Sequence, residues 1–137
     1  IPDGPAFAQL NLIEEEGILP AAWVWTHAGE GTAEGRLRAA HRGAWISLDS
    51  VNKEELEIVL KMINELKSAG LMNRVLISHD AGWFDPDEPD GGEFVGYTDI
   101  FNHLVPALKG NGFSQSEINQ LLIENPKNAY KISKRVN

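Results

Sequence analysis

The chain repeats one pattern three times, in which a short apolar segment with a polar end is followed by a helical segment. The apolar segments are residues 22–27 (Ala-Trp-Val-Trp-Thr-His), 43–49 (Gly-Ala-Trp-Ile-Ser-Leu-Asp) and 74–80 (Arg-Val-Leu-Ile-Ser-His-Asp). Nearly continuous apolar runs of this length are typical of parallel strands that are covered on both faces. Because parallel neighbours need crossovers between them, the sequence predicts an α/β fold with right-handed connections. Both an open doubly wound sheet and a (β/α) barrel fit this order.

Apolar residues at helical spacing predict the helices. They cover residues 52–69 and 114–124 and, with weaker signals, about 5–16, 32–42 and 98–109. Ser114 and Glu117 have the spacing of a capping box at the start of a helix. Proline has no amide hydrogen for the helical ladder. We therefore expect Pro126 to stop the helix that begins at Ser114, and Pro106 to kink or divide the helix that contains it.

The composition fits one acidic globular domain. The 137 residues include 12 Lys and Arg against 20 Asp and Glu, for a net charge of −8, and no Cys. The absence of Cys excludes a disulfide framework, thiolate-bound zinc and a thiol nucleophile. The negative charge argues against nucleic acid or an anionic membrane as the main partner. No apolar run approaches the roughly 20 residues of a spanning helix, and no signal peptide is evident, so we expect a cytoplasmic protein.

Side chains alternate between the faces of a strand, so the polar strand ends predict which residues share a face. Counting back from His27, Asp49 and Asp80 places all three on one face, at the carboxyl ends of the strands. Behind them the same face carries Trp23, Trp25, Trp45, Ser47, Leu76 and Ser78. Large and small residues in alternation suit the interlocking layers inside a barrel. The opposite face should pack under helices and carries Val24, Ile46, Leu48, Val75 and Ile77.

The polar strand ends form a candidate metal site, because the carboxyl ends of the strands are the ligand face in both α/β architectures. Imidazole nitrogen and carboxylate oxygen suit zinc, manganese or iron better than calcium. Alternatively, His27 bonds within a loop, and Asp49 and Asp80 cap the helices that follow. The metal interpretation is favoured for His27 and Asp80, whereas the two are balanced for Asp49. His79 is expected to face the helices and to be structural.

Residues 81–97 form a long acidic segment that also carries aromatic side chains. The aromatic residues are Trp83, Phe84, Phe94 and Tyr97. Loops of this length in compact domains are usually functional or disordered. We expect a lid over the candidate site, and a solvated acidic excursion is the alternative.

Residues 29–35 follow a strand and contain three glycines, as a phosphate-binding loop would. Their spacing differs from the dinucleotide fingerprint. In addition, Glu30 and Glu34 would repel a phosphate group. A flexible turn before a helix is therefore the preferred interpretation of this segment.

Three motifs in the later part of the chain point to a known family. Residues 75–83 read Val-Leu-Ile-Ser-His-Asp-Ala-Gly-Trp, residues 106–109 read Pro-Ala-Leu-Lys, and residues 124–129 read Glu-Asn-Pro-Lys-Asn-Ala. With the helix at residues 9–17 and the strand that ends at His27, they have the order seen in the phosphotriesterase family of the amidohydrolase superfamily. The chain resembles that family over nearly its whole length. The resemblance implies a TIM barrel, (β/α)₈, that binds two divalent metal ions, usually zinc, at its carboxyl end.

By this resemblance the chain is a single partial domain over residues 1–137 and holds strands 6–8 with their helices, the C-terminal half of the barrel. His27 corresponds to the metal-binding His of the sixth strand. Asp80 corresponds to the Asp of the eighth strand, which binds metal and acts catalytically by accepting a proton from the attacking water. Because the other four of six expected ligands lie outside the chain, we expect partial or no metal binding by the chain alone.

Two positions depart from the family's pattern. Glu30 stands where some members have an Asp in a proton relay from the eighth-strand Asp. Ser50 stands where that relay has a His, or where lactonase relatives have an Arg. The relay, and organophosphate hydrolysis with it, is therefore not implied. Trp83 maps near the leaving-group pocket, and we expect Trp83, Ser50 and Glu30 to contact the substrate.

The expected function is that of a metal-dependent hydrolase. In the complete barrel, metal-bound hydroxide would attack a lactone, a carboxylic ester or a phosphoester. Alone, the chain is expected to be inactive and to expose Trp23, Trp25 and Trp45. It should then form a homo-oligomer or associate with the missing N-terminal part. The alternatives are a non-catalytic α/β binding module that uses residues 81–97, and an open-sheet phosphate-binding enzyme that uses residues 29–35.

Overall fold

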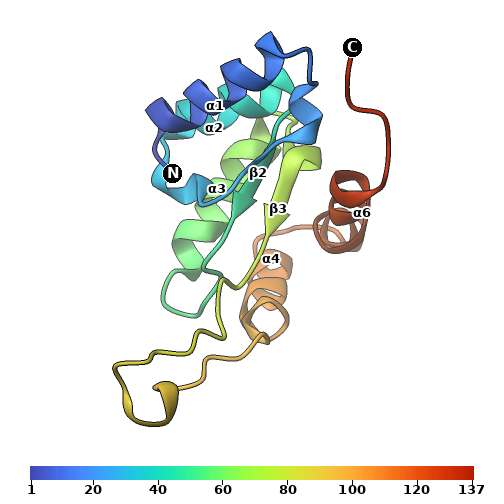
Figure 1. The fold of residues 1–137 in the computed structure, drawn as a ribbon. Helices are drawn as coiled ribbons and strands as arrows, with labels where there is room; N and C mark the ends of the chain where they lie inside the picture. Colours follow the sequence, from blue (N-terminus) through green and yellow to red (C-terminus); the bar gives the residue numbers. More distant parts are fainter.

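Three short parallel strands form the centre of the structure, a computed structural model that describes all 137 residues (Figure 1). Strands β1 (Val24–Trp25), β2 (Trp45–Leu48) and β3 (Val75–Ile77) pair in the order β1-β2-β3. Each strand lies within a segment predicted as a strand and is shorter than the apolar run around it. The predicted α/β class with a parallel sheet is confirmed.

Helices surround this sheet, with α1, α2 and α3 together on one side of it and α6 beside β3 (Figure 1). The α-helices are α1 (Asp3–Glu15), α2 (Ala33–Arg42), α3 (Leu56–Ser68), α4 (Val105–Gly110), α5 (Gln115–Asn119) and α6 (Asn125–Tyr130). A π-helical turn at Ile100–Leu104 leads into α4, and another at Gln120–Glu124 joins α5 to α6. Short 3₁₀ turns lie at Pro20–Ala22, Ala28–Glu30, Met72–Arg74 and Pro89–Gly91. None of the helices is long and apolar enough to cross a membrane.

The π-helical turns show how proline is accommodated in the last helices. The prediction that Pro126 stops its helix is wrong, because α6 continues through this residue to Tyr130. Before Pro126, the amide of Asn125 bonds to the carbonyl of Gln120, one residue further back than in an α-helix. This wider turn makes room for the proline, so the helix continues. A π-helical turn also precedes Pro106, and the helix likewise continues through this residue to Gly110, so the expectation that Pro106 divides its helix is wrong as well.

The register of the sheet corrects the predicted face of β1. Trp25 pairs with Ile46, and both lie in the main core with the helices. Val24 pairs instead with Trp45 and packs in a separate small cluster. His27, from which the predicted alternation starts, has a left-handed backbone (φ 54°) and lies beyond the strand. Because that conformation breaks the alternation, the count assigned the wrong face to the residues before it.

The same error affects Trp23, which stacks on Trp25 with ring centroids 6.4 Å apart and packs against the main core. For β2 and β3 the predicted faces are confirmed. Ser47 pairs with Leu76 on the face of Trp45, away from the helical core. Trp25 and Trp45 are only 0% and 4% exposed, so the expectation that the chain exposes both is wrong.

The later part of the chain covers Trp45. Ala129 of α6 packs against this ring, and the guanidinium of Arg74 lies 5.2 Å from its centroid. The indole Nε1 donates a hydrogen bond to the carbonyl of Ala21 at 3.2 Å. Helix α6, which continues past the predicted end at Pro126, therefore covers the amino-terminal end of the strands.

Candidate functional site

The carboxyl ends of the three strands share an uncommon backbone conformation. His27 follows β1, Ser50 follows β2 and Asp80 follows β3, and their φ angles are 54°, 60° and 48°. Such conformations cost a non-glycine residue roughly 1–3 kcal/mol, persist only where surrounding contacts hold them, and cluster at functional sites. The backbone therefore marks the same strand ends that the sequence predicted as a site.

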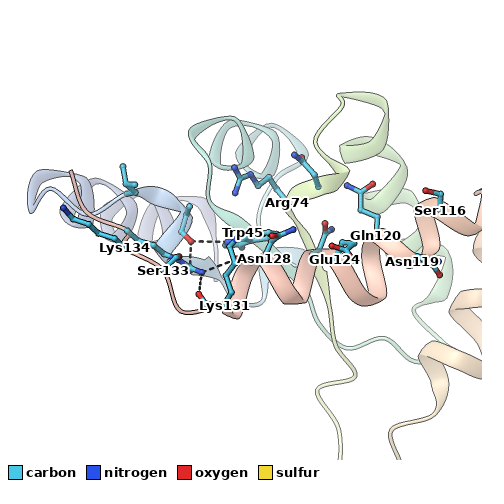
Figure 2. A pocket seen from close by; sticks show the side chains of 15 residues that line it. Trp45, Arg74, Ser116, Asn119, Gln120, Glu124, Asn128, Lys131, Ser133 and Lys134 are labelled. Atoms are coloured by element: carbon cyan, nitrogen blue, oxygen red, sulfur yellow. Dashed lines mark hydrogen bonds between the residues drawn. The ribbon is translucent and has the colours of Figure 1, made fainter.

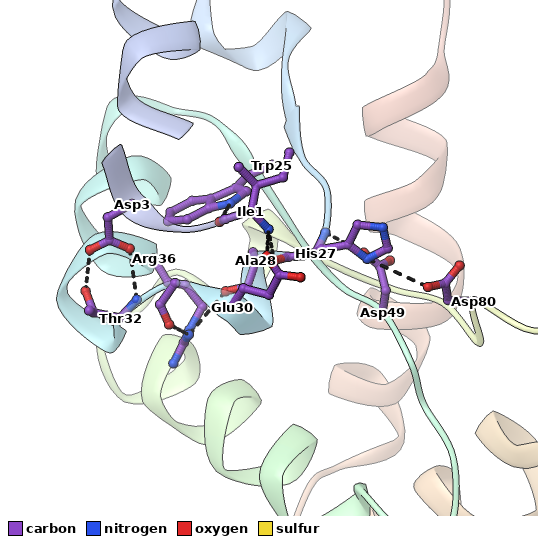
Figure 3. A network of polar contacts seen from close by, with 11 residues as sticks. Ile1, Asp3, Trp25, His27, Ala28, Glu30, Thr32, Arg36, Asp49 and Asp80 are labelled. Atoms are coloured by element: carbon purple, nitrogen blue, oxygen red, sulfur yellow. Dashed lines mark hydrogen bonds and ion pairs between the residues drawn. The ribbon is translucent and has the colours of Figure 1, made fainter. Parts of the chain in front are cut away.

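The imidazole of His27 lies between two carboxylates (Figure 3). Its Nδ1 is 3.3 Å from Oδ2 of Asp49 and 3.7 Å from Oδ2 of Asp80. The side chain of His27 is 43% exposed and that of Asp80 is 28% exposed, whereas that of Asp49 is 7% exposed. The structure thus brings the three predicted residues together, with His27 and Asp80 open to solvent.

Asp49 accepts hydrogen bonds from residues of all three strand segments. Its Oδ2 accepts the backbone N–H of His27 at 2.6 Å. Its Oδ1 accepts the hydroxyls of Ser47 at 2.7 Å and Ser78 at 2.8 Å. The sequence prediction placed both serines on this face without assigning them a role. The sequence does carry a signal for them, because each serine stands two positions before the Asp at the end of its strand segment.

Helix capping does not explain the two aspartates. The turn before α3 is capped by Asn52, whose Oδ1 accepts the N–H of Glu55 at 2.8 Å. The side chain of Asp80 has His27 as its partner, and no helix begins directly after it. His79 faces the helices as predicted, because its Nε2 accepts the N–H of Ile100 at 3.0 Å.

His27 and Asp80 have the chemistry and spacing of two metal ligands. Two ligands of a tetrahedral zinc ion, with bonds of about 2.1 Å, lie roughly 3.4 Å apart, close to the 3.7 Å between Nδ1 and Oδ2. However, the chain holds no group of three or more His, Cys, Asp or Glu side chains placed to bind a metal ion. The pair can therefore supply part of a coordination shell but not all of it.

Two cavities border this pair. One, of about 250 Å³, is lined by Ser50, Asp80 and Trp83 among others. The other, of about 360 Å³, is lined by His27, Glu30 and Ser50 among others. The residues predicted to contact substrate therefore divide between the two cavities, and Ser50 borders both.

Residues 81–97 extend away from the rest of the molecule (Figure 1). Trp83 and Phe84 are each 73% exposed, and Phe94 is 70% exposed. The base of the loop contributes Trp83 to the cavity beside Asp80. Closure of this loop as a lid stays a prediction.

The glycine-rich turn before α2 is closely packed and is not an open anion site. The Asp3 carboxylate accepts the N–H of Thr32 at 2.9 Å and its hydroxyl at 2.6 Å (Figure 3). The hydroxyl bond holds the pKa of Asp3 below its usual value. A Cβ on Gly31 would lie 2.5 Å from the ring of Trp25, and one on Gly35 would lie 2.4 Å from Asp3. A phosphate would meet this carboxylate, so the phosphate-binding alternative is wrong.

The largest cavity, of about 760 Å³, lies at the opposite end of the strands (Figure 2). Trp45 and Arg74, at the starts of β2 and β3, line it together with residues of α5, α6 and the C-terminal segment. Arg135 crosses this region and donates to the carbonyls of Ala21 at 2.8 Å and Ala129 at 2.6 Å. None of the strand-end residues lines this cavity, so it is separate from the candidate site.

Comparison with known proteins places the chain in a family. The model of the phosphotriesterase family matches residues 2–130. The chain therefore belongs to the phosphotriesterase family.

Curated relatives are more than twice as long as the chain. The phosphotriesterase homology protein of Escherichia coli is 28% identical over 122 residues, which cover 86% of this chain and 41% of that protein. The protein of the same name from Mycobacterium tuberculosis is 27% identical over 136 residues, with coverage of 90% and 40%. The N-acetyltaurine hydrolase of Xenopus tropicalis is 35% identical over 68 residues, 50% of this chain and 19% of that protein. The chain thus spans about 40% of the length of the first two.

Solved structures of similar fold give the same coverage. The E. coli phosphotriesterase homology protein, solved with phosphate in its active site, has a TM-score of 0.76 at 25% identity and matches 90% of this chain and 43% of that chain. The organophosphorus hydrolase of Deinococcus radiodurans has a TM-score of 0.75 at 19% identity, with coverage of 90% and 42%, and so shows the fold alone. The chain has the fold of one portion of a phosphotriesterase-like TIM barrel.

Proposed function

We propose that the chain supplies strands 6–8, the C-terminal half, of a phosphotriesterase-family barrel as a single partial domain, and that His27 and Asp80 bind metal there. One observation carries this proposal, the 3.7 Å separation of His27 Nδ1 and Asp80 Oδ2 at the carboxyl ends of parallel strands. Active sites of TIM barrels lie at that end. The family match over residues 2–130 supports the same assignment.

The complete barrel would be a metal-dependent hydrolase of a lactone, a carboxylic ester or a phosphoester. Two divalent metal ions, usually zinc in this family, would polarise the substrate and lower the pKa of a bound water to about 7. His27 would contribute a ring nitrogen to the metal site. Asp80 would contribute one carboxylate oxygen and take up the proton of the attacking water, since its partly exposed side chain has no other protein partner than His27.

The substrate would lie over the two cavities beside this pair. Trp83 borders the cavity that contains Asp80 and would contact the leaving group with its ring. Glu30 borders the cavity that contains His27 and would contact the other side of the substrate. Ser50 lies between them and could donate its hydroxyl to a substrate oxygen. Phosphate in the active site of the E. coli relative supports the phosphoester among these substrates.

The isolated chain would not hydrolyse substrate, because two ligands do not hold two metal ions. Its three-stranded sheet has unpaired edges at β1 and β3, and unpaired edges favour pairing with another chain. We propose the remainder of the barrel, or a second copy of this chain, as the partner. Since Trp25 and Trp45 are buried, the strand edges and not these tryptophans would drive the association.

Metal content and mass of the gel-filtered chain test the proposal. We expect zinc or manganese in the assembled form, with most of it lost in His27→Ala and Asp80→Asn. His41→Ala is the matched control, because His41 is exposed on α2 and should not affect metal content. Equal metal in all variants, or metal-dependent hydrolysis by a monomer, would contradict the proposal. A metal-free chain that still binds a partner through residues 81–97 would favour the non-catalytic binding module.

A further inference from the structure

One carboxylate joins the ends of all three strands. Asp49 follows β2 and accepts the His27 backbone N–H from the β1 end, at 2.6 Å. It also accepts the hydroxyl of Ser47 within β2 and that of Ser78 just after β3, at 2.7 Å and 2.8 Å. Its side chain is only 7% exposed. The contact that reaches back to His27 therefore belongs to a hydrogen-bonded carboxylate that is shielded from solvent.

These contacts leave Asp49 little capacity to bind a metal ion itself. A carboxylate has about four lone-pair positions. Three protein donors occupy three of them, and Nδ1 of His27 approaches the same Oδ2 to 3.3 Å. Asp80, in contrast, directs its Oδ2 at the His27 ring without such donors. The two aspartates at the strand ends therefore have different tasks.

We propose that Asp49 is a positioning residue that holds His27 in its left-handed conformation with its ring facing Asp80. A backbone N–H bonded to a carboxylate is charge-assisted and stronger than a neutral hydrogen bond. It can therefore offset the cost of the positive φ at His27. Because the same carboxylate also contacts the ring, it sets both the backbone and the side chain of His27. The proposal rests on the metal-binding function proposed above for His27.

Substitutions at position 49 separate this function from general stability. Asp49→Ala removes the acceptor of the His27 N–H and leaves Ser47 and Ser78 without their partner. Asp49→Asn keeps the shape, so its amide oxygen can still accept the His27 N–H while the negative charge is lost. Ser47→Ala is the matched control, because it removes one bond to the carboxylate and leaves the His27 contact in place.

The test uses two measurements on the 137-residue chain. In the metal-free chain, we expect the His27 amide proton to be shifted downfield and slow to exchange. Both properties should be lost in Asp49→Ala, partly kept in Asp49→Asn and kept in Ser47→Ala. In a chelator competition, the zinc affinity of Asp49→Ala should fall by about 10–100-fold, as for other partners that orient metal ligands. Ser47→Ala should bind zinc nearly as tightly as the unmodified chain.

The outcomes distinguish this inference from the proposed function. An unchanged His27 amide, or an unchanged zinc affinity in folded Asp49→Ala, would overturn the inference. If the unmodified chain binds no zinc even in its assembled form but its His27 amide responds to Asp49→Ala, the metal-binding function proposed for His27 fails and the positioning contact is supported. If Asp49→Ala does not fold, Asp49→Asn tests the inference in its place. The chemical shift of its His27 amide proton must then move toward the value of an ordinary amide.

Discussion

At the start of α2, the packing depends on one carboxylate and on a glycine that leaves room for it. The carboxylate of Asp3, from the first turn of α1, caps the backbone of Thr32. This contact needs Gly35, because a Cβ there would lie 2.4 Å from Oδ1 of Asp3. A glycine pattern that is typical of anion binding therefore makes room for an anionic side chain of the chain itself.

Gly35→Ala is expected to lower the free energy of unfolding by about 1–3 kcal/mol, the usual cost of overpacking. Gly4→Ala is the matched control, since a Cβ at Gly4 in α1 meets nothing within 4 Å. There alanine should be neutral or stabilising by roughly 0.5–1 kcal/mol, because it favours a helix over glycine. Urea unfolding measures both variants, and equal stabilities would contradict the packing described for Gly35.

Among the elements, α5 is tied to α3 through its cap. The capping box predicted for Ser114 and Glu117 is confirmed. Glu117 also pairs with Lys67 of α3, with Oε1 and Nζ 2.8 Å apart. The hydrogen bond from Lys67, together with those from Ser114, lowers the pKa of Glu117 from 4.5 to about 2. A local signal in the sequence thus supports a contact between two helices.

The lowered pKa of Glu117 predicts how the stability of the chain depends on pH. Its ionised form stabilises the folded chain above pH 4.5, and this contribution is lost as the pH falls through about 2. Glu117→Gln should therefore be less stable at pH 7 and lose less stability than the unmodified chain between pH 4.5 and 2. Urea unfolding at several pH values measures this difference. Glu57→Gln, exposed on α3, should keep the original pH dependence.

At the scale of the whole molecule, the C-terminal segment is held against the segment between α1 and β1, at the amino-terminal end of the strands. Val136 bridges Ile18 in an isolated antiparallel pair. Arg135 donates from one guanidinium to Ala21, before β1, and to Ala129, at the end of α6. This guanidinium closes the amino-terminal end of the strands from the side of the C-terminal segment.

Arg135→Ala is expected to lower the free energy of unfolding by about 1–3 kcal/mol, since it removes charge-assisted bonds to backbone carbonyls. Trp45, which bonds to the same Ala21 carbonyl, should become more accessible to acrylamide in fluorescence quenching. Lys134→Ala removes a neighbouring charge without these bonds and should change neither quantity. Unchanged stability and quenching in Arg135→Ala would show that the C-terminal segment does not hold the chain together.

Local periodicity was enough to predict the α/β class, the three strand segments and the meeting of His27, Asp49 and Asp80. The strands are parallel, so their carboxyl ends lie at one edge, and a residue at each end is brought there by topology alone. The structural function of His79 followed from alternation along β3. These predictions succeeded because each depends on neighbours in the sequence and on one general rule of chain direction.

Tertiary contacts decided the remaining features. The face of Trp25 depends on the left-handed His27, and that conformation depends on a carboxylate 22 positions later in the chain. The burial of Trp45 depends on the C-terminal helix, which continues past Pro126 because a π-helical turn forms before it. No periodic pattern in the sequence signals any of these contacts. They arise from the packing of distant segments and override the local alternation by which the faces were predicted.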